Sequence, residues 1–337
     1  MGSTKNPKPV KTLTVCLSHK EDADGICSAA LIREAFGGDT VLVDYPEQMD
    51  ALEGIAADLT LKQLYICDLG LSKKNQDRFV EILTALRKRH VGVTYIDHHD
   101  IDPAVTESLE SVGVKMVHDL NECTTVQVYH KFKSKLSDHS AFVAAIAAIT
   151  DYMEDRPRGA QLLQIFDRQF ALINATVLTY NIVGHQKEPE YLLELVDALS
   201  NSKYPHDMPN TFEFAQIQVA KLAQVFSQVK DGMHVMRNLG YMEITDAGAS
   251  GAVNFVLGLS RRNVGIAYKE RADYGIYAVS IRGAKSCTVH LGKLTNRLAM
   301  EVGGSGGGHD RACGAVIPKN KITTFIRAFN NELDNGV

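Results

Sequence analysis

The sequence of 337 residues contains no tryptophan, and aromatic residues make up only 7% of it. Surfaces that hold extended single strands stack successive bases on aromatic side chains, and no ladder of such side chains is evident in this sequence. The net charge is only −4. The sequence therefore lacks the overall positive field that holds long duplex nucleic acid, and any contact with nucleic acid must be local.

Paired cysteines and long apolar runs are also missing. The six cysteines lie far apart, and no two of them form a C-x-x-C pair. This spacing argues against a disulfide framework or a zinc ribbon and favours small buried side chains in a reducing compartment, so we expect a cytoplasmic protein. No apolar run approaches the length of a membrane span, and the first residues lack the apolar core of a signal peptide. We expect no association with a membrane.

The remaining composition is that of an ordinary globular protein, with 45% hydrophobic and 23% charged residues. Its length allows two domains with cores of their own. In the first half, strand signals alternate with helix signals, which predicts a mostly parallel sheet with helices on both faces. The expected strands are residues 12–18, 40–45, 63–68 and 91–97, and the expected helices cover about 25–36, 47–57 and a segment capped by Ser72, with Phe79, Ile82, Leu83 and Leu86 on its apolar face.

Strand signals disappear after about residue 156, and apolar residues then recur at helical spacing. They return beyond residue 240, in the segments 264–268 and 274–281. We therefore predict three parts: an α/β domain over residues 10–155, a helical connector over 156–230, and a smaller α/β domain over 231–337.

Acidic residues and histidines follow the apolar runs of the first half. His19, Asp22 and Asp24 come after the first expected strand, Asp68 after the third, and Asp97, His98 and His99 after the fourth, while Asp151 follows the apolar stretch 142–150. Because the carboxyl ends of parallel strands meet at one edge of a sheet, where such folds bind ligands, we expect these side chains to gather there.

Such a gathering of carboxylates needs positive charge. Two like charges ~4 Å apart repel by about 4 kcal/mol at an effective dielectric near 20. Two divalent cations would compensate four carboxylates, and oxygen ligands without a thiolate favour Mn²⁺ or Mg²⁺. Taken singly, each motif is more simply a turn or a helix cap, so the prediction of a metal site depends on their joint, ordered occurrence.

This ordered set, followed much later by the glycine-rich segment 303–309, resembles the DHH phosphoesterase family with its C-terminal DHHA1 domain, which includes RecJ-type exonucleases and nano-RNases. The resemblance implies two ions bridged by Asp68. It assigns His19, Asp22 and Asp68 to one ion and Asp24, Asp68, His98 and Asp151 to the other. It also implies that Asp97 orients an imidazole and that His99 faces the substrate phosphate and stabilises the transition state.

The glycine-rich segment is neither a Walker A loop nor a dinucleotide fingerprint. Its successive backbone N–H groups could form an anion-binding nest. The resemblance implies that Gly306, Gly307, Gly308 and His309 grip the substrate together with Arg282. Arg282 ends a strand that could lie beside the glycine-rich segment.

The leading hypothesis is a manganese-dependent phosphodiesterase, an exonuclease or oligoribonuclease, with its active site in the cleft between the two domains. It would hydrolyse single-stranded DNA or RNA, or short oligonucleotides, to nucleoside 5′-monophosphates, with Asp68 and His99 as catalytic residues. One alternative is hydrolysis of a cyclic dinucleotide or another small nucleotide. The other alternative is a non-catalytic scaffold that binds a DNA replication or repair protein. The sequence leaves open the choice between DNA and RNA, the polarity of cleavage and the formation of a homodimer.

Overall fold

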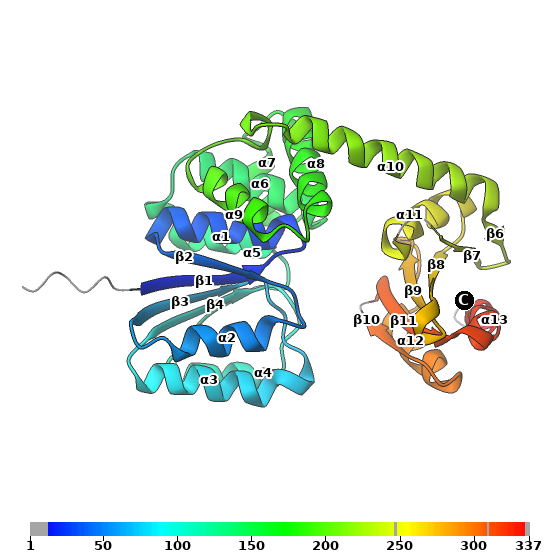
Figure 1. Cartoon of the computed structure of the whole chain (residues 1–337), viewed down its shortest axis with the longest axis horizontal. Helices are drawn as coiled ribbons and strands as arrows, with labels where there is room; N and C mark the ends of the chain where they lie inside the picture. Colours follow the sequence, from blue (N-terminus) through cyan, green and yellow to red (C-terminus); the bar gives the residue numbers. More distant parts are fainter. Residues whose placement is uncertain (1–12, 246–247, 309, 334–337) are drawn as a thin grey trace, which may run out of the picture. The chain divides into compact units, whose positions relative to one another are not determined.

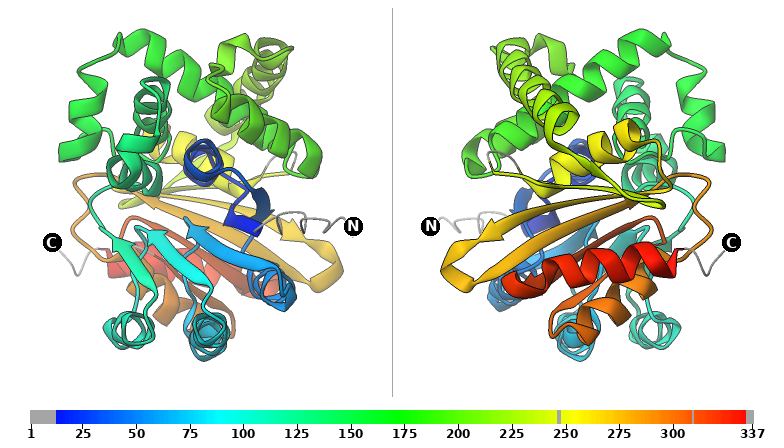
Figure 2. Two further views of the ribbon diagram at one scale, coloured as in Figure 1. Left: turned by 90° about the vertical axis from the view of Figure 1, so that its left-hand side faces the viewer. Right: turned by 90° about the vertical axis from the view of Figure 1, so that its right-hand side faces the viewer.

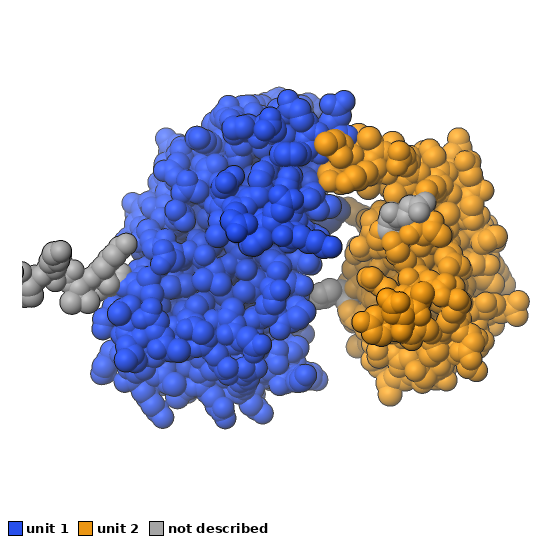
Figure 3. Space-filling view, viewed as in Figure 1, with its two compact units in different colours: residues 1–216 blue, residues 217–337 orange. Residues whose placement is uncertain are grey.

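The computed structural model describes residues 13–245, 248–308 and 310–333. The chain forms two compact units, residues 1–216 and 217–337, which Figure 3 shows in different colours. Among the described residues, no helix combines the length and the apolar character needed to cross a membrane.

The first unit is built on a five-stranded sheet in which every pair of neighbouring strands is parallel. The strands lie in the order β2-β1-β3-β4-β5. This confirms the mostly parallel sheet that the sequence predicts. The strand order changes direction between β1 and β3, and ligands bind at such a switch point in open α/β sheets. The strands are β1 (Leu13–His19), β2 (Asp39–Val43), β3 (Leu61–Cys67), β4 (Gly92–Asp97) and β5 (Lys115–His118).

Helices cover both faces of this sheet, also as predicted (Figure 1). One face carries α2 (Gln48–Ala57), α3 (Gln76–Lys88) and α4 (Pro103–Ser111), which bury Leu52, Phe79 and Leu109 against the strands. The other face carries α1 (Ala23–Phe36), α5 (Thr124–Phe132) and α6 (His139–Thr150), whose core includes Ile26 and Phe142. With both faces covered, the central strands β1, β3 and β4 are buried over most of their length, as is typical of parallel sheets.

Only helices and short turns follow α6 in the first unit. They are α7 (Pro157–Leu163), α8 (Arg168–Gly184) and α9 (Pro189–Ser200), and α10 (Thr211–Gly232) begins in the first unit and continues into the second. The boundaries of the three parts inferred from the sequence stay a prediction.

The second unit contains a six-stranded mixed sheet in the order β10-β11-β9-β8-β7-β6. The helix α13 buries Phe325 and Phe329 in the core of this sheet, and it is the red helix in the right-hand view of Figure 2. The elements are β6 (His234–Val235), β7 (Leu239–Glu243), α11 (Ala249–Ser260), β8 (Val264–Arg271), β9 (Ile276–Gly283), α12 (Leu291–Glu301), β10 (Ser305–Gly308), β11 (Ala312–Pro318) and α13 (Ile322–Glu332).

One predicted helix start is wrong. Ser72 precedes a short 3-10 turn over Lys73–Asn75, and its side chain makes no capping hydrogen bond. The α-helix α3 begins only at Gln76, and its N-cap residue is Asn75. The buried face of the helix nevertheless includes Phe79, Leu83 and Leu86, as its spacing predicts.

Candidate metal centre

The candidate site begins where α1 meets the end of β1. The side chain of Asp22 accepts a hydrogen bond from the Gly25 amide at 3.0 Å and thereby caps α1. A Cβ atom at Gly25 would lie 2.2 Å from the carbonyl oxygen of His19. Only glycine allows this close approach, and it places Asp22 and Asp24 beside the histidine that ends β1.

A first group of possible ligands surrounds His19. Its Nδ1 lies 2.8 Å from Asp22 Oδ2 and 3.8 Å from Asp68 Oδ2. These three residues each offer a ligand atom within 4.8 Å of the others. The Nε2 atom of His19 is buried and has no hydrogen-bond partner, with Asp44 Oδ1 at 3.8 Å. A buried nitrogen without a hydrogen-bond partner is consistent with a site that binds an ion.

A second group surrounds His98. Its Nε2 lies 3.4 Å from Asp68 Oδ1 and 4.0 Å from Asp24 Oδ2, and its Nδ1 lies 3.6 Å from Asp151 Oδ2. The Oδ2 atom of Asp151 is buried and has no hydrogen-bond partner. Asp68 thus lies between the two groups, with one carboxylate oxygen facing each, and all six residues assigned to metal binding lie in one neighbourhood.

Asp151 reaches this neighbourhood from a helix, whereas the other ligands follow strands. The apolar run that precedes it is the helix α6 and not a strand, so Asp151 comes from the C-terminal end of a helix. Asp24 also has a second role. Its Oδ2 and Oδ1 accept hydrogen bonds from the Thr124 and Thr125 amides at 2.7 and 2.8 Å, so this carboxylate caps α5.

Asp68 has an unusual backbone conformation, with φ at +55° in the left-handed region. Its amide donates a hydrogen bond to Ile96 O at 3.1 Å, and its side chain is buried and accepts a hydrogen bond from Thr124 Oγ1 at 3.3 Å. Aspartate tolerates this region better than most residues, but such positions still cluster at functional sites.

The electrostatics of the cluster call for cations. Burial raises the pKa of Asp151 to about 9, with further contributions from Asp24 and Asp22. Burial and the same two carboxylates raise the pKa of Asp68 well above its usual range. Burial lowers the pKa of His98, which favours the neutral imidazole that binds metals.

The donor set therefore fits divalent cations that prefer oxygen and imidazole ligands, such as Mn²⁺ and Mg²⁺. A thiol is also close, since Cys123 groups with Asp24 and Asp151. Burial raises the pKa of Cys123 well above its usual range, so this side chain stays a neutral thiol.

Asp97 orients His99 and not His98. Asp97 Oδ1 lies 2.8 Å from His99 Nδ1, and Asp97 Oδ2 accepts a hydrogen bond from Tyr95 at 3.0 Å. Burial alone would raise the pKa of Asp97, but the hydrogen bond with His99 and its charge outweigh burial and lower it. A Cβ atom at Gly70 would lie 3.0 Å from the His99 ring, so the imidazole is also held by packing.

Two residues of the site were missed from the sequence. Asp44 and Tyr45 follow β2 at the same sheet edge, and the Tyr45 hydroxyl lies 3.4 Å from His99 Nε2. The rule that strand ends carry site residues would have found them, but the predicted strand extended through residue 45 and so included both.

The glycine-rich segment in the second unit differs from expectation. Gly306, Gly307 and Gly308 belong to the strand β10, which lies at the edge of the sheet and pairs with β11. Arg282 lies in β9 and pairs with β11 from the other side, so the strand of Arg282 does not lie beside the glycines. Arg282 is half-buried, its Nη1 donates to Ile281 O at 3.1 Å, and His309 lies outside the described residues.

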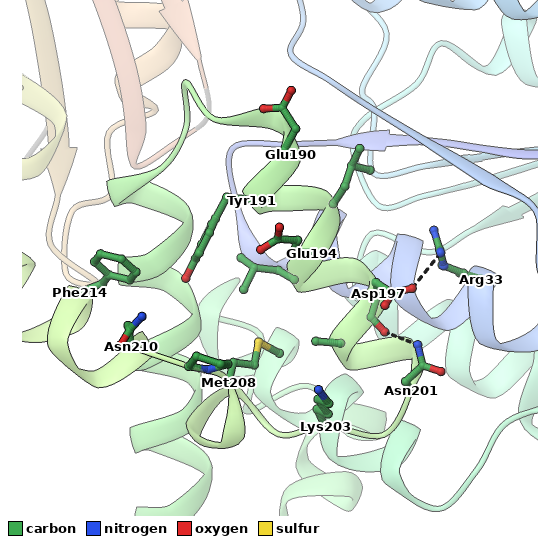
Figure 4. A pocket seen from close by; sticks show the side chains of 14 residues that line it. Arg33, Glu190, Tyr191, Glu194, Asp197, Asn201, Lys203, Met208, Asn210 and Phe214 are labelled. Carbon is green, nitrogen blue, oxygen red and sulfur yellow. Dashed lines mark hydrogen bonds and ion pairs between the residues drawn. The ribbon is translucent and has the colours of Figure 1, made fainter.

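The first unit also has an open hollow of about 880 Å³ among its helices (Figure 4). It is lined mainly by α9 and by the segment that leads into α10, with an ion pair of 2.8 Å between Arg33 and Asp197 at one side. None of the residues predicted for the site lines it, so it does not bear on the metal cluster.

Comparison with known proteins supports this picture. Residues 239–335 match the family model of the DHHA1 domain. A search of curated proteins found no significant match.

Among solved structures, a pGpG-specific phosphodiesterase, PggH from Vibrio cholerae, is 13% identical with a TM-score of 0.63, and the match covers 96% of this chain and 100% of that one. CDC45 from Entamoeba histolytica is 10% identical with a TM-score of 0.63, covering 96% and 95%. RecJ from Thermus thermophilus, solved with Mn²⁺, is 15% identical with a TM-score of 0.55, covering 96% of this chain and 52% of that one. At these identities the structures show a shared fold.

Proposed function

Because the chain has the fold of DHH-family phosphoesterases and carries their DHHA1 domain, we propose that it is a metal-dependent phosphodiesterase that hydrolyses single-stranded nucleic acid or short oligonucleotides. One observation carries the proposal. The buried Asp68 lies between two groups of carboxylates and imidazoles, and each group could hold one divalent cation.

The residues have distinct proposed roles. His19, Asp22 and Asp68 would hold one ion, and Asp24, Asp68, His98 and Asp151 the other, with Mn²⁺ as the preferred metal. Two such ions stabilise charge on a phosphoryl group and lower the pKa of bound water. Asp97 contacts His99 Nδ1 at 2.8 Å. Burial alone would lower the pKa of His99, but the hydrogen bond with Asp97 raises it and favours the imidazolium, whose Nε2–H can donate a hydrogen bond to a phosphoryl oxygen of the substrate.

The second unit would contribute to substrate binding. We propose that Arg282, the backbone amides of Gly306, Gly307 and Gly308, and His309 contact a phosphate next to the one that is cleaved. Cleavage would release nucleoside 5′-monophosphates. A guanidinium and backbone amides both suit phosphate oxygens.

Two alternatives have different support. The likeness to a pGpG-specific phosphodiesterase favours a small nucleotide substrate, linear or cyclic. The likeness to CDC45 favours a scaffold with a replication partner. A scaffold has no need of metal ligands, whereas this chain keeps its carboxylates and histidines close together, and that observation favours the enzyme.

The test is cleavage of end-labelled DNA, RNA, linear dinucleotides and cyclic dinucleotides in the presence of Mn²⁺. We expect mononucleotides from at least one linear substrate. Asp68→Asn should abolish turnover and the rise in melting temperature that Mn²⁺ produces by binding the native state. Asp77→Asn, an exposed position on α3, is the matched control and should keep both. Absence of cleavage on every substrate, or full activity of Asp68→Asn, would contradict the proposal.

A further inference from the structure

A large aromatic side chain stands next to the metal cluster with no role in the fold. Tyr152 directly follows Asp151, and 82% of its surface is exposed. Among the described residues, its side chain has no hydrogen bond and no ring contact. Single exposed apolar residues are common, so exposure alone decides nothing. The backbone of Tyr152 is more informative.

Tyr152 occupies a position that normally belongs to glycine. Its φ is +58°, in the left-handed region. Its amide donates to Ile149 O at 3.2 Å, and the Met153 amide donates to Ala148 O at 2.8 Å. These two bonds are those of a Schellman motif at the end of α6, in which glycine is preferred because it has no Cβ atom. The fold would therefore be served better by glycine, and the tyrosine ring needs another explanation.

A second exposed tyrosine lies beside the first group of possible ligands. Tyr45 is 41% exposed, and its ring centroid lies 5.2 Å from that of His19. Its hydroxyl is 3.4 Å from His99 Nε2, and the two rings are nearly perpendicular at 88°. Part of the ring is thus fixed against two site histidines, and the rest faces solvent.

The contacts place Tyr45 beside His19 of the first group, and the chain places Tyr152 next to Asp151 of the second group. Tyr45 contacts His99, whose ring centroid lies 4.5 Å from that of His98. His98 Nδ1 in turn lies 3.6 Å from Asp151 Oδ2, and Tyr152 is the next residue. A phosphodiester held between the two groups would therefore have a tyrosine beside each group.

We propose that Tyr45 and Tyr152 each stack on one of the two bases that flank the cleaved phosphodiester. This inference rests on the proposed function and narrows it, because it names a linear substrate with a base on both sides of the scissile phosphate. Base–aromatic stacking tolerates every base, so we expect little sequence preference. Two isolated rings also suit the end of a strand or a dinucleotide, since they do not form a longer ladder.

The experiment uses the full-length protein with Mn²⁺ and three labelled dinucleotides: one with both bases, one without the 5′ base and one without the 3′ base. Tyr152→Gly and Tyr45→Leu are compared with Tyr152→Phe and Tyr45→Phe. Each ring-removing variant should lower kcat/KM on the intact dinucleotide by roughly 5- to 150-fold, the range expected from loss of one stacked base. Compared with the phenylalanine variant at the same position, it should have no effect on the dinucleotide that already lacks the base on which the ring stacks. The unaffected dinucleotide should differ between the two ring-removing variants.

The phenylalanine variants separate stacking from other roles. Tyr152→Phe should behave as wild type. Tyr45→Phe keeps the ring but loses the hydroxyl that faces His99, so any loss shared by all three substrates reports positioning of His99 and not stacking.

A matched control exists for the backbone change at Tyr152. His90 has φ at +61° and occupies the same motif at the end of α3, where its amide donates to Arg87 O and the Val91 amide donates to Leu86 O. This residue precedes β4, at the sheet edge opposite to the cluster. Both His90→Gly and Tyr152→Gly should keep or raise the melting temperature, and only Tyr152→Gly should weaken turnover.

Failure of this inference can be told apart from failure of the proposed function. If wild type cleaves the intact dinucleotide and the Tyr152→Gly and Tyr45→Leu variants cleave it equally well, stacking is refuted and the phosphodiesterase stands. Binding gives a second readout without turnover. In the Asp68→Asn background, removal of either ring should weaken binding of the intact dinucleotide, and unchanged binding would also refute the inference.

Discussion

The junction of β1 and α1 allows a sharp test of how the fold positions the site. In Gly25→Ala, the new Cβ atom would lie 2.2 Å from His19 O and 2.8 Å from His19 Cβ. An ordinary contact needs more than 3 Å, so α1 or the end of β1 must move. Such overpacking costs about 1–3 kcal/mol. Replacement of glycine by alanine within a helix returns about 0.5–1 kcal/mol, so we expect a net loss of stability.

Gly54 supplies the matched control because nothing lies within 4 Å of a Cβ atom built there. It lies within α2 and is exposed, so Gly54→Ala should stabilise the protein by about 0.5–1 kcal/mol. Both variants share the gain from removing glycine, and the difference between them isolates the steric cost.

The assay is thermal unfolding followed by circular dichroism, with and without Mn²⁺. A change of 1 kcal/mol shifts the melting temperature by about 2–4 °C in a domain of 150–250 residues. Gly25→Ala should melt lower and lose most of the shift produced by Mn²⁺, because His19 and Asp22 are displaced. Gly54→Ala should melt higher and keep that shift. Equal behaviour of the two variants would refute the close contact and its role in positioning the ligands.

Three further predictions test other parts of the site and fold. Without a cation, the pKa of Asp151 is raised to about 9 by burial and then by neighbouring carboxylates, so this group adds stability at low pH that is lost as the pH rises toward 9. Mg²⁺ binding near pH 7 should therefore release protons, and the affinity should increase as the pH rises. Calorimetry in buffers of different ionisation enthalpy would measure the proton release, and an affinity independent of pH would contradict the prediction. Asp97→Asn should lower kcat by roughly 10- to 100-fold because Asp97 orients His99. Metal affinity, measured by titration, should stay nearly unchanged. An equal loss of metal affinity would indicate that Asp97 is a metal ligand. Ser72→Ala should change the free energy of unfolding by less than about 0.5 kcal/mol, because Ser72 makes no capping hydrogen bond. Asp102→Ala removes the cap of α4 and should lower the free energy of unfolding by about 1 kcal/mol. Equal midpoints of urea unfolding for the two variants would contradict this difference.

The parallel sheet and the acids at its edge could be predicted because they depend on local signals. Each of the strands β1, β3 and β4 is a largely apolar run with a histidine or aspartate at its end or directly after it. The sequence indicates the helix α6 less clearly than it indicates these strands. All residues from Ser140 to Ala148 are buried, so their hydrophobicity has no period, and a helix cannot then be told from a strand by pattern.

The glycine-rich segment could not be predicted for a different reason. Glycine has low strand propensity, and β10 exists because β11 supplies a partner for its backbone groups. A Cβ atom at Gly306 would lie 2.8 Å from the Cβ atom of Ala315, so part of the glycine content reflects close packing of these strands. Such pairing between strands is set by tertiary structure and leaves no mark in the local sequence.

The capping role of Asp24 shows which substitutions can test the metal site. Asp22 caps α1, and Asp24 holds the first two amides of α5, about a hundred residues away in the chain. Loss of activity in a variant of either residue would therefore mix lost metal binding with a lost cap, which alone costs about 0.5–2 kcal/mol.

Asp68 and Asp151 differ from Asp22 and Asp24 because their side chains cap no helix. Both carry a strongly raised pKa because burial disfavours their charge, and Asp151 has a buried oxygen without a hydrogen-bond partner. In the absence of a cation, these two carboxylates lower the stability of the fold. Asp68→Asn and Asp151→Asn should therefore raise the melting temperature of the metal-free protein while abolishing the response to Mn²⁺. A loss of stability without metal would mean that these side chains serve the fold and not an ion.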